Sequence, residues 1–239
     1  MTDNRAATGI AELDRMLGGG LPRGTFTLLE GPPGSGKSVF AQLFVRKGLE
    51  NGEGCVYICV DDPPAMVRKQ IVEFGWDPVR YEEEGLLAFI DCFSWRIGGS
   101  TERYAVLNAM TYDKLTEVVR EARSSLRAKS DRQRSVVDSM TTLLPQLPVD
   151  DALRLLSWLK ARAVQMPGKA SLWLAHRTSM KPQLYSILLD NVGGIIELRL
   201  KDEPEALIRE LRVTAMPFRA PTPRWIPFDI KGGSIHLSL

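Results

Sequence analysis

The sequence has no long hydrophobic run. Its apolar stretches all fall well short of the roughly 20 residues that a helix needs to cross a bilayer, so we expect no membrane insertion. The first five residues do not combine a basic start with a following apolar segment, so no secretory signal is predicted. Both absences favour a cytoplasmic protein.

Cysteine is also scarce, with 3 among 239 residues. On an extended strand Cys55 and Cys59 would lie about 13 Å apart, which is too far for a disulfide. The two histidines, His176 and His236, leave too few ligands for a four-coordinate zinc site. These counts favour a reducing compartment and exclude a small disulfide-stabilised fold.

A strong excess of charge of one sign is missing as well. The chain has 31 basic and 29 acidic residues, a formal net charge of +2. A protein that depends on nucleic acid usually carries a larger basic excess, so we expect nucleic-acid binding to be weak or absent. The densest basic run lies between residues 120 and 134, and we interpret it as a solvated face because acidic residues interrupt it.

What the sequence does contain is an alternation of short apolar runs and longer segments of helical periodicity. This alternation is typical of α/β proteins, so we predict a mainly parallel central sheet flanked by helices. The predicted strands are 25–29, 55–60, 86–90, 136–138 and 171–175. The predicted helices are 37–50, 64–74, 113–129 and 150–165, and the segments 94–111 and 177–189 are interpreted as loops.

The pattern changes after residue 192. Four short runs separated by turns predict antiparallel hairpins over 195–200, 207–214, 225–230 and 235–237. The Pro/Arg-rich segment 217–227 is expected to be irregular, because proline cannot donate a hydrogen bond to a strand ladder.

A phosphate-binding motif lies between the first predicted strand and the first predicted helix. Residues 31–38 match the pattern G-x-x-x-x-G-K-[S/T]. In this motif backbone N–H groups surround the phosphates, the lysine reaches the β- and γ-oxygens, and the hydroxyl is a ligand for Mg²⁺. We therefore predict that Lys37 binds the nucleotide and takes part in catalysis, and that Ser38 is a ligand of Mg²⁺. The predicted nucleotide-binding residues are Gly31, Pro32, Pro33, Gly34, Ser35, Gly36, Lys37, Ser38 and Val39.

Acidic residues end two of the predicted strands. Asp138 follows a pair of valines, where P-loop proteins place the carboxylate that holds the metal's water shell; a surface Asp-Ser turn is the alternative. Asp61 and Asp62 end the second predicted strand, before the helix predicted over 64–74. They could orient and deprotonate an attacking water, with Asp61 as the base supported by Asp62, or they could cap the following helix.

These motifs resemble a KaiC-like ATPase of the RecA superfamily, of the single-domain archaeal type. The resemblance covers nearly the whole chain and implies one domain over 1–239, with a lead-in over 1–24, a nucleotide-binding core over 25–192 and a β extension over 193–239. It implies a RecA-type core that binds ATP with Mg²⁺ between subunits of a ring, often a hexamer. The motifs that carry it, besides the P-loop, are Thr8-Gly9-Ile10, Leu13-Asp14, Gly18-Gly19-Gly20, Phe74-Gly75-Trp76-Asp77, the segment 136–143 and Pro227-Phe228-Asp229-Ile230.

Two positions depart from the family pattern. Asp61 and Asp62 replace a Glu-Glu pair, and each side chain is about 1.5 Å shorter. The family's K-x-R-G-T motif presents cations to the neighbouring subunit's nucleotide, but residues 215–219 read AMPFR. Each of three arginines could replace the missing cations or could be a solvated surface residue. They are Arg212, Arg219 and Arg224.

His176 follows the predicted strand 171–175, where RecA-type ATPases place a polar residue that senses the γ-phosphate. A hydrogen-bonded packing residue is the alternative interpretation. The segment 177–189 corresponds to the DNA-binding region of RecA-like recombinases, and Arg177, Lys181 and Tyr185 would suit backbone contact and base stacking.

Three functions follow as expectations. The first is a slow Mg²⁺-dependent ATPase, with turnover on the order of a few ATP per hour to a few per minute. It would act as a ring-forming regulatory or signalling module, a hexameric homo-oligomer with a possible protein partner. The second is an ATP-binding interaction module with negligible hydrolysis. The third is a recombinase paralogue that binds DNA, which the near-neutral charge disfavours.

Overall fold

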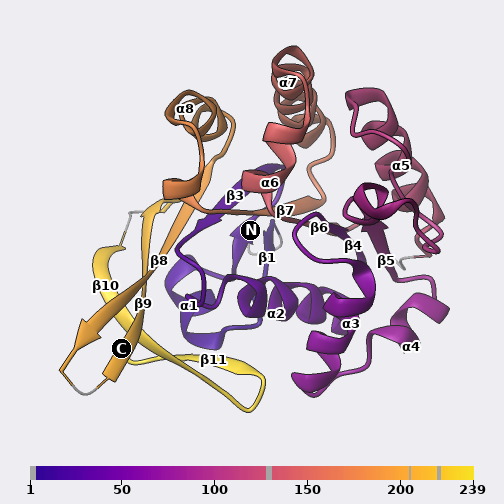
Figure 1. The fold of residues 1–239 in the computed structure, drawn as a ribbon. Coiled ribbons are helices and arrows are strands. Elements are labelled where there is room, and N and C mark those ends of the chain that lie inside the picture. The colour runs from indigo at the N-terminus through magenta and orange to yellow at the C-terminus, as the bar shows by residue number, and fades with distance from the viewer. Residues whose placement is uncertain (1–3, 128–130, 205, 220–221) are drawn as a thin grey trace.

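A twisted central sheet organises the fold, in a computed structural model that describes residues 4–127, 131–204, 206–219 and 222–239 (Figure 1). Its strands are β3 (Thr25–Glu30), β4 (Gly54–Cys59), β5 (Leu87–Asp91), β6 (Gln133–Asp138), β7 (Lys169–Ala175), β8 (Gly194–Glu203), β9 (Ala206–Ala215), β10 (Thr222–Lys231) and β11 (Ser234–Leu237). They lie in the order β11-β10-β9-β8-β3-β7-β6-β4-β5. From β8 to β5 the strands run parallel, and from β8 to β11 antiparallel. The predicted α/β fold with an antiparallel C-terminal region is confirmed.

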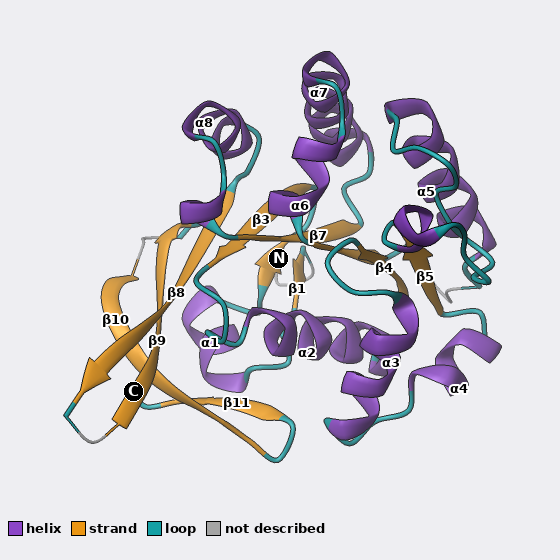
Figure 2. Ribbon diagram, viewed as in Figure 1, coloured by secondary structure: helices purple, strands orange, loops and turns teal. Residues whose placement is uncertain are grey.

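Helices cover both faces of this sheet (Figure 2). One face carries α1 (Ala11–Leu17), α2 (Lys37–Glu50), α3 (Pro64–Glu73) and α4 (Pro78–Glu83). The other face carries α5 (Tyr112–Ser125), α6 (Met140–Leu143), α7 (Val149–Gln165) and α8 (Pro182–Asp190). Short elements complete the chain: β1 (Arg5–Ala6), β2 (Leu21–Pro22), η1 (Ser94–Ile97), η2 (Leu144–Gln146) and η3 (Arg177–Ser179).

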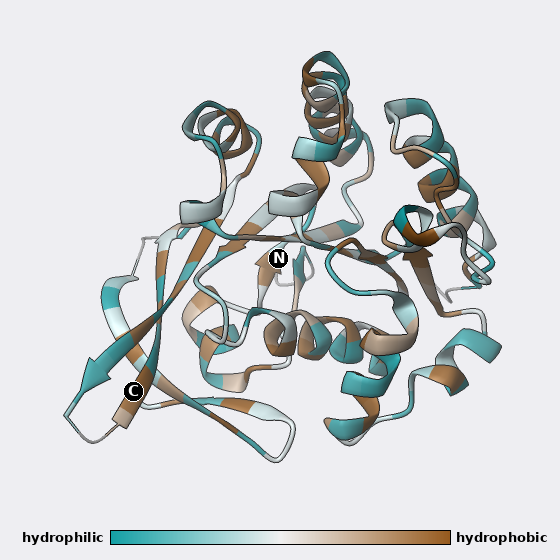
Figure 3. Cartoon of the chain, in the orientation of Figure 1, coloured by the Kyte–Doolittle hydropathy of each residue, from teal (hydrophilic) through white to brown (hydrophobic). Residues whose placement is uncertain are grey.

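Two apolar cores lie on either side of the sheet. Phe40 and Phe44 of α2 belong to one core, and Phe26 stacks on Trp173 in the other with ring centroids 4.0 Å apart. Every residue of β4 is buried, as expected for a strand covered on both faces. Figure 3 shows hydrophobic residues concentrated along the central strands, whereas the far end of β8 is hydrophilic. In the described part of the chain no helix has the length and hydropathy that a membrane crossing requires.

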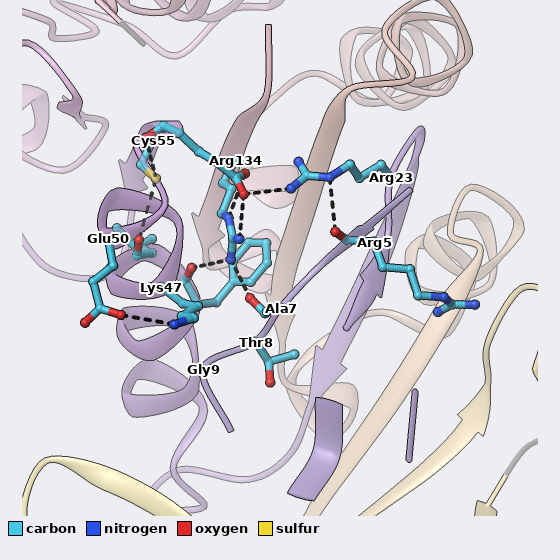
Figure 4. A network of polar contacts seen from close by, with 12 residues as sticks. Arg5, Ala7, Thr8, Gly9, Arg23, Lys47, Glu50, Cys55 and Arg134 are labelled. Atoms are coloured by element: carbon cyan, nitrogen blue, oxygen red, sulfur yellow. Dashed lines mark hydrogen bonds and ion pairs between the residues drawn. The ribbon is translucent and has the colours of Figure 1, made fainter. Parts of the chain in front are cut away.

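A buried ion-pair network joins the N-terminal segment to the core (Figure 4). Both Arg23 and Arg134 donate to the Glu53 carboxylate, at 2.7 Å and 2.9 Å. Arg134 also donates to the carbonyl oxygen of Ala7, and Arg23 to that of Arg5. This network explains an error of the sequence analysis, which began the strand near residue 136. β6 begins at Gln133 because the charge of Arg134 is neutralised inside the protein.

Four other expectations are corrected. The segment 177–189, predicted as a loop, contains η3 and most of α8. Part of 217–227, predicted as irregular, belongs to β10, whose pairing with β9 shifts register between Thr222 and Ile226. Helix α5 ends at Ser125, and residues 128 and 129 of the predicted helix lie outside the described residues. The basic run 120–134 is not wholly solvated, because Arg134 is only 1% exposed.

Candidate nucleotide-binding site

The phosphate-binding loop connects β3 to the N-terminus of α2. Its backbone requires glycine at Gly36, which has a φ of 97° and would place a Cβ 3.0 Å from Cδ1 of Ile230. Ser35 is buried, and its hydroxyl donates to the carbonyl oxygen of Pro32 at 2.7 Å. The first N–H groups of α2 have no acceptor within the helix, so they face the loop as ready donors for an anion.

Lys37 lies folded against this loop. Its Nζ donates to the carbonyl oxygens of Gly31 and Pro32 at 2.7 Å and 2.9 Å. Burial lowers the pKa of Lys37 to about 8, although Asp138 and Asp61 act in the opposite direction. A phosphate oxygen would be a stronger, charged acceptor than either carbonyl. The ammonium is thus held next to the place where phosphates would bind.

Asp138 lies at the C-terminal end of β6, as predicted. The hydroxyl of Tyr57, from the neighbouring β4, donates to its Oδ2 at 2.8 Å. Burial raises the pKa of Asp138 to about 6, and hydrogen bonds from Tyr57 and Ser38 oppose the shift. The carboxylate therefore lies beside the predicted metal-binding hydroxyl, and it is not the surface Asp-Ser turn of the alternative interpretation.

The two aspartates after β4 have different surroundings. Asp61 lines the cleft over the loop, and its Oδ1 accepts hydrogen bonds from the N–H and hydroxyl of Ser139 at 3.3 Å and 3.2 Å. Asp62 is exposed, is not part of the cleft wall, and accepts a hydrogen bond from Gln70 at 3.4 Å. Helix α3 begins after Pro63 without a side-chain cap. The helix-cap interpretation therefore does not hold for either aspartate.

His176 lines the same cleft at the end of β7. Its backbone N–H donates to Oγ1 of Thr141 at 2.7 Å, while its imidazole has no hydrogen bond among the described residues. Burial, together with the charge of Lys37, lowers the pKa of His176 below its ordinary value. A neutral imidazole thus faces the cleft at neutral pH.

The cleft that these residues share has a volume of about 600 Å³. It contains Lys37, Ser38, Asp61, Asp138 and His176, which come from four separate segments of the sequence. Its remaining described lining residues are Pro33, Gly34, Gly36, Val39, Phe74, Arg209 and Ile230.

Three contributors to this region were missed by the sequence analysis. Arg209, on β9, donates from Nε to the carbonyl oxygen of Gly34 at 3.1 Å. Phe74 and Ile230 form apolar parts of the wall. Phe74 and Ile230 do belong to quoted family motifs, so position within those motifs was an available signal. Nothing local to the sequence distinguishes Arg209 from the other arginines of the C-terminal strands.

The three arginines considered as substitutes for the missing cations lie outside this cleft. Arg212 is paired with Glu197 at 2.6 Å and lies over the ring of Trp225. The guanidinium of Arg219 occupies the space beside Gly18 where a Cβ would stand. Arg224 is exposed and makes no polar or ring contact with the described residues.

The donor set suits a triphosphate and a hard divalent cation. Mg²⁺ prefers oxygen ligands, and the hydroxyl of Ser38 and the carboxylate of Asp138 supply two of them side by side. The glycine turn, the first N–H groups of α2 and Lys37 supply an anion cradle next to them. The residues present therefore fit ATP with Mg²⁺.

The chain is similar to known proteins over most of its length. The family model for the KaiC ATPase matches residues 6–238. A UPF0273 protein of Pyrococcus furiosus is 36% identical over 229 residues, which cover 95% of this chain and 90% of that protein. One from Methanopyrus kandleri is 35% identical over 240 residues, 99% of this chain and 93% of that protein. The crystal structure of a KaiC-like protein of Pyrococcus horikoshii superimposes with a TM-score of 0.79 at 26% identity, covering 98% of this chain and 99% of that chain.

Proposed function

The chain belongs to the KaiC ATPase family, and on this premise we propose that it is a slow Mg²⁺-dependent ATPase that acts as a ring-forming regulatory or signalling module. The observation that supports the activity best is the meeting of Lys37, Asp138 and Asp61 in one cleft. A bound ATP with Mg²⁺ would supply the γ-phosphoryl group and the charge that neutralises it.

Each residue of the cleft has a role in this proposal. Lys37 binds the β- and γ-oxygens, and Ser38 and Asp138 hold the metal and its water shell. Asp61 accepts the proton of the attacking water at Oδ2, because Oδ1 is already occupied by Ser139. The neutral imidazole of His176 senses the γ-phosphate.

Two features support slow turnover. Asp61 is one methylene shorter than the glutamate of the family pattern, and Ser139 restrains it. Two arginines of the C-terminal strands are engaged within the chain, since Arg209 donates to the carbonyl oxygen of Gly34 and Arg212 is paired with Glu197. A cation supplied by a neighbouring subunit can accelerate phosphoryl transfer by about 10³-fold or more, so its absence would cost turnover strongly.

A ring is proposed because the family's nucleotide lies at a subunit boundary, and we propose a hexamer. Of the three candidate arginines, Arg212 is paired with Glu197 and Arg219 lies beside Gly18, whereas Arg224 is exposed on β10, so we choose Arg224 as the candidate that reaches a neighbour. An ATP-binding interaction module with negligible hydrolysis is the second candidate, favoured by the restraint of Asp61.

DNA binding remains the weaker alternative. Tyr185 donates to Glu30 at 2.5 Å, and Arg177 lies over the Tyr185 ring at 5.5 Å. Two of the three side chains considered for base stacking and backbone contact are thus engaged within the protein. We expect only weak association that falls steeply with salt.

One experiment separates these functions. Solution mass is measured by light scattering with and without ATP and Mg²⁺, and phosphate release is followed in the same samples. A nucleotide-stabilised ring with slow release supports the proposal. A ring without release above that of Lys37→Ala supports the interaction module, and a monomer with saturating ATP contradicts the ring. Tight, salt-resistant binding of single-stranded DNA would favour the recombinase alternative.

A further inference from the structure

A second cavity, which shares no lining residue with the nucleotide cleft, lies between the sheet and the helices α5 and α7, which stand next to each other on one face (Figure 2). Its volume is about 60 Å³. Much of its wall is apolar, including Met140, Leu155, Trp158 and Trp173. Its lining includes Thr25 at the start of β3 and Lys169 at the start of β7, so this end of the cavity lies at the edge of the sheet opposite the P-loop. Its inner wall extends along the sheet to Val137 and Met140, next to the end of β6. The six-residue β3 separates the two edges by roughly 17 Å.

The rim of this cavity is cationic. Arg123 of α5, Arg162 of α7 and Lys169 at the start of β7 all belong to its lining, together with Arg120. Arg123 donates to the hydroxyl of Ser135 at 2.9 Å. Among the described residues no acidic side chain lines the cavity or forms an ion pair with these cations. Elsewhere in the fold, the buried arginines of the N-terminal network are paired with Glu53.

Arg123, Arg162 and Lys169 are half-buried and lie close enough for their charges to lower the pKa of Arg123 and of Lys169. Burial, followed by the charge of Arg162, lowers the pKa of Arg123 to about 10. Burial, followed by the charges of Arg123 and Arg162, lowers the pKa of Lys169 to about 8. Like charges that are partly removed from solvent and have no counter-charge repel one another. A bound anion would therefore stabilise Arg123, Arg162 and Lys169.

We propose that this cavity binds a small carboxylate with a short apolar chain. The carboxylate would lie among Arg123, Arg162 and Lys169, and the chain would enter the apolar space beside Trp158. The cavity volume of about 60 Å³ sets the size of the chain, since it is less than half of the ~150 Å³ that accommodates a benzene ring. A short-chain fatty acid therefore fits the charge and the volume, whereas a long acyl chain or a bulky aromatic acid does not.

This proposal is independent of ATP hydrolysis. The site shares no residue with the nucleotide cleft, so nucleotide binding can serve as a test that a variant remains folded.

The test is isothermal titration of the full chain with butyrate, acetate and butylamine. We expect butyrate to bind at millimolar concentration or better, and acetate at least about tenfold more weakly because it lacks two buried methylenes. Butylamine, which has the chain without the negative charge, should not bind. No heat with butyrate, or equal affinities for butyrate and acetate, would overturn the proposal.

Three variants locate the site. Arg162→Gln should weaken butyrate binding by about tenfold or more, because it removes a charged hydrogen-bond donor. Ala163→Leu should abolish it by filling the cavity while the cations remain. Lys69→Gln is the matched control, since Lys69 is exposed on α3. Unchanged butyrate binding in Arg162→Gln would contradict the site. A change in the solution mass of Arg162→Gln with unchanged butyrate binding would also contradict it, because Arg162 would then serve contacts between chains.

Discussion

The hydroxyl of Tyr57 donates a hydrogen bond of 2.8 Å to Oδ2 of Asp138, across two neighbouring parallel strands. This bond orients the carboxylate beside Ser38 and opposes the rise in the pKa of Asp138 that burial causes. Groups that orient a metal-binding carboxylate in this way commonly contribute 10- to 100-fold to metal affinity, as an order of magnitude.

We predict that Tyr57→Phe weakens Mg²⁺-dependent nucleotide binding by about tenfold or more while metal-free binding persists. Asp138→Asn should abolish the increase in nucleotide affinity that Mg²⁺ causes. Isothermal titration with ATP in the presence and absence of Mg²⁺ measures both effects. Tyr104→Phe is the control, because its hydroxyl bonds to Ser125 outside the nucleotide cleft. Equal losses with and without the metal would contradict the proposed role of Tyr57.

Lys37→Ala should weaken ATP binding by about 100-fold, since it removes charge-assisted hydrogen bonds to the phosphates. The fold should persist, because the replaced ammonium contacts only loop carbonyl oxygens. Lys47→Ala is the matched control, because Lys47 lies on the same helix, is partly exposed and is paired with Glu50. Unchanged ATP affinity in folded Lys37→Ala protein would refute the P-loop assignment.

Glu53→Gln should destabilise the protein by about 3–5 kcal/mol, because two buried guanidiniums would lose their shared carboxylate. Urea unfolding measures the change in the free energy of unfolding. The exposed Glu50→Gln, three residues away, should change it by less than about 1 kcal/mol. A similar small effect in both variants would show that the network in Figure 4 adds little stability.

The pKa of Lys169 predicts a pH dependence of stability. In the folded state the pKa is about 8 because of burial, with Arg123 on α5 and Arg162 on α7 adding to the shift, whereas the ordinary value is 10.5. Between these values the unfolded chain binds more protons, so the free energy of unfolding should rise with pH. After allowance for partial exposure, the contribution is on the order of 1 kcal/mol.

Thermal unfolding of the wild type and of Lys169→Gln between pH 7.5 and pH 10.5, roughly the window of this titration, isolates the effect. Lys37, which has a similar pKa, is present in both proteins and cancels in the comparison. The wild type should gain more stability across the window than Lys169→Gln. Identical gains would show that Lys169 is not perturbed by its neighbours.

The main parallel strands and the P-loop could be predicted because their signals are local. A strand covered on both faces, such as β4, appears as an uninterrupted apolar run, and the loop motif is contiguous. The start of β6 could not be predicted, since the partner that neutralises Arg134 is Glu53, 81 residues away. Tyr57 reaches Asp138, and Arg209 reaches the cleft, through strand register, which no local pattern specifies.

Two errors have signals that were available. Helix α8 begins with Pro182 in its first turn, which is a favoured position for proline at a helix start. In β10, Pro227 has no N–H to donate, but its carbonyl oxygen accepts a hydrogen bond from the N–H of Ser238 at 2.9 Å. A proline-rich segment is thus compatible with a strand when its carbonyl oxygens carry the pairing.

Arg224→Ala tests the ring and its cation separately. If a neighbouring subunit supplies Arg224 to the nucleotide, the variant should lose turnover by about tenfold or more while ATP affinity in the monomer's own cleft is kept. Phosphate release measured together with solution mass distinguishes a lost cation from a lost ring. Full turnover in the variant would exclude Arg224 as the trans cation.

The central claim is that Asp61 activates water for slow ATP hydrolysis, and steady-state phosphate release by the wild type, Asp61→Asn and Asp62→Asn tests it most directly. The account predicts wild-type turnover on the order of a few per hour to a few per minute. Asp61→Asn should fall to the background of Lys37→Ala, and Asp62→Asn, whose carboxylate lies outside the cleft wall, should keep most of the activity. Wild-type turnover of many ATP per second, or an unchanged rate in Asp61→Asn, would contradict the account.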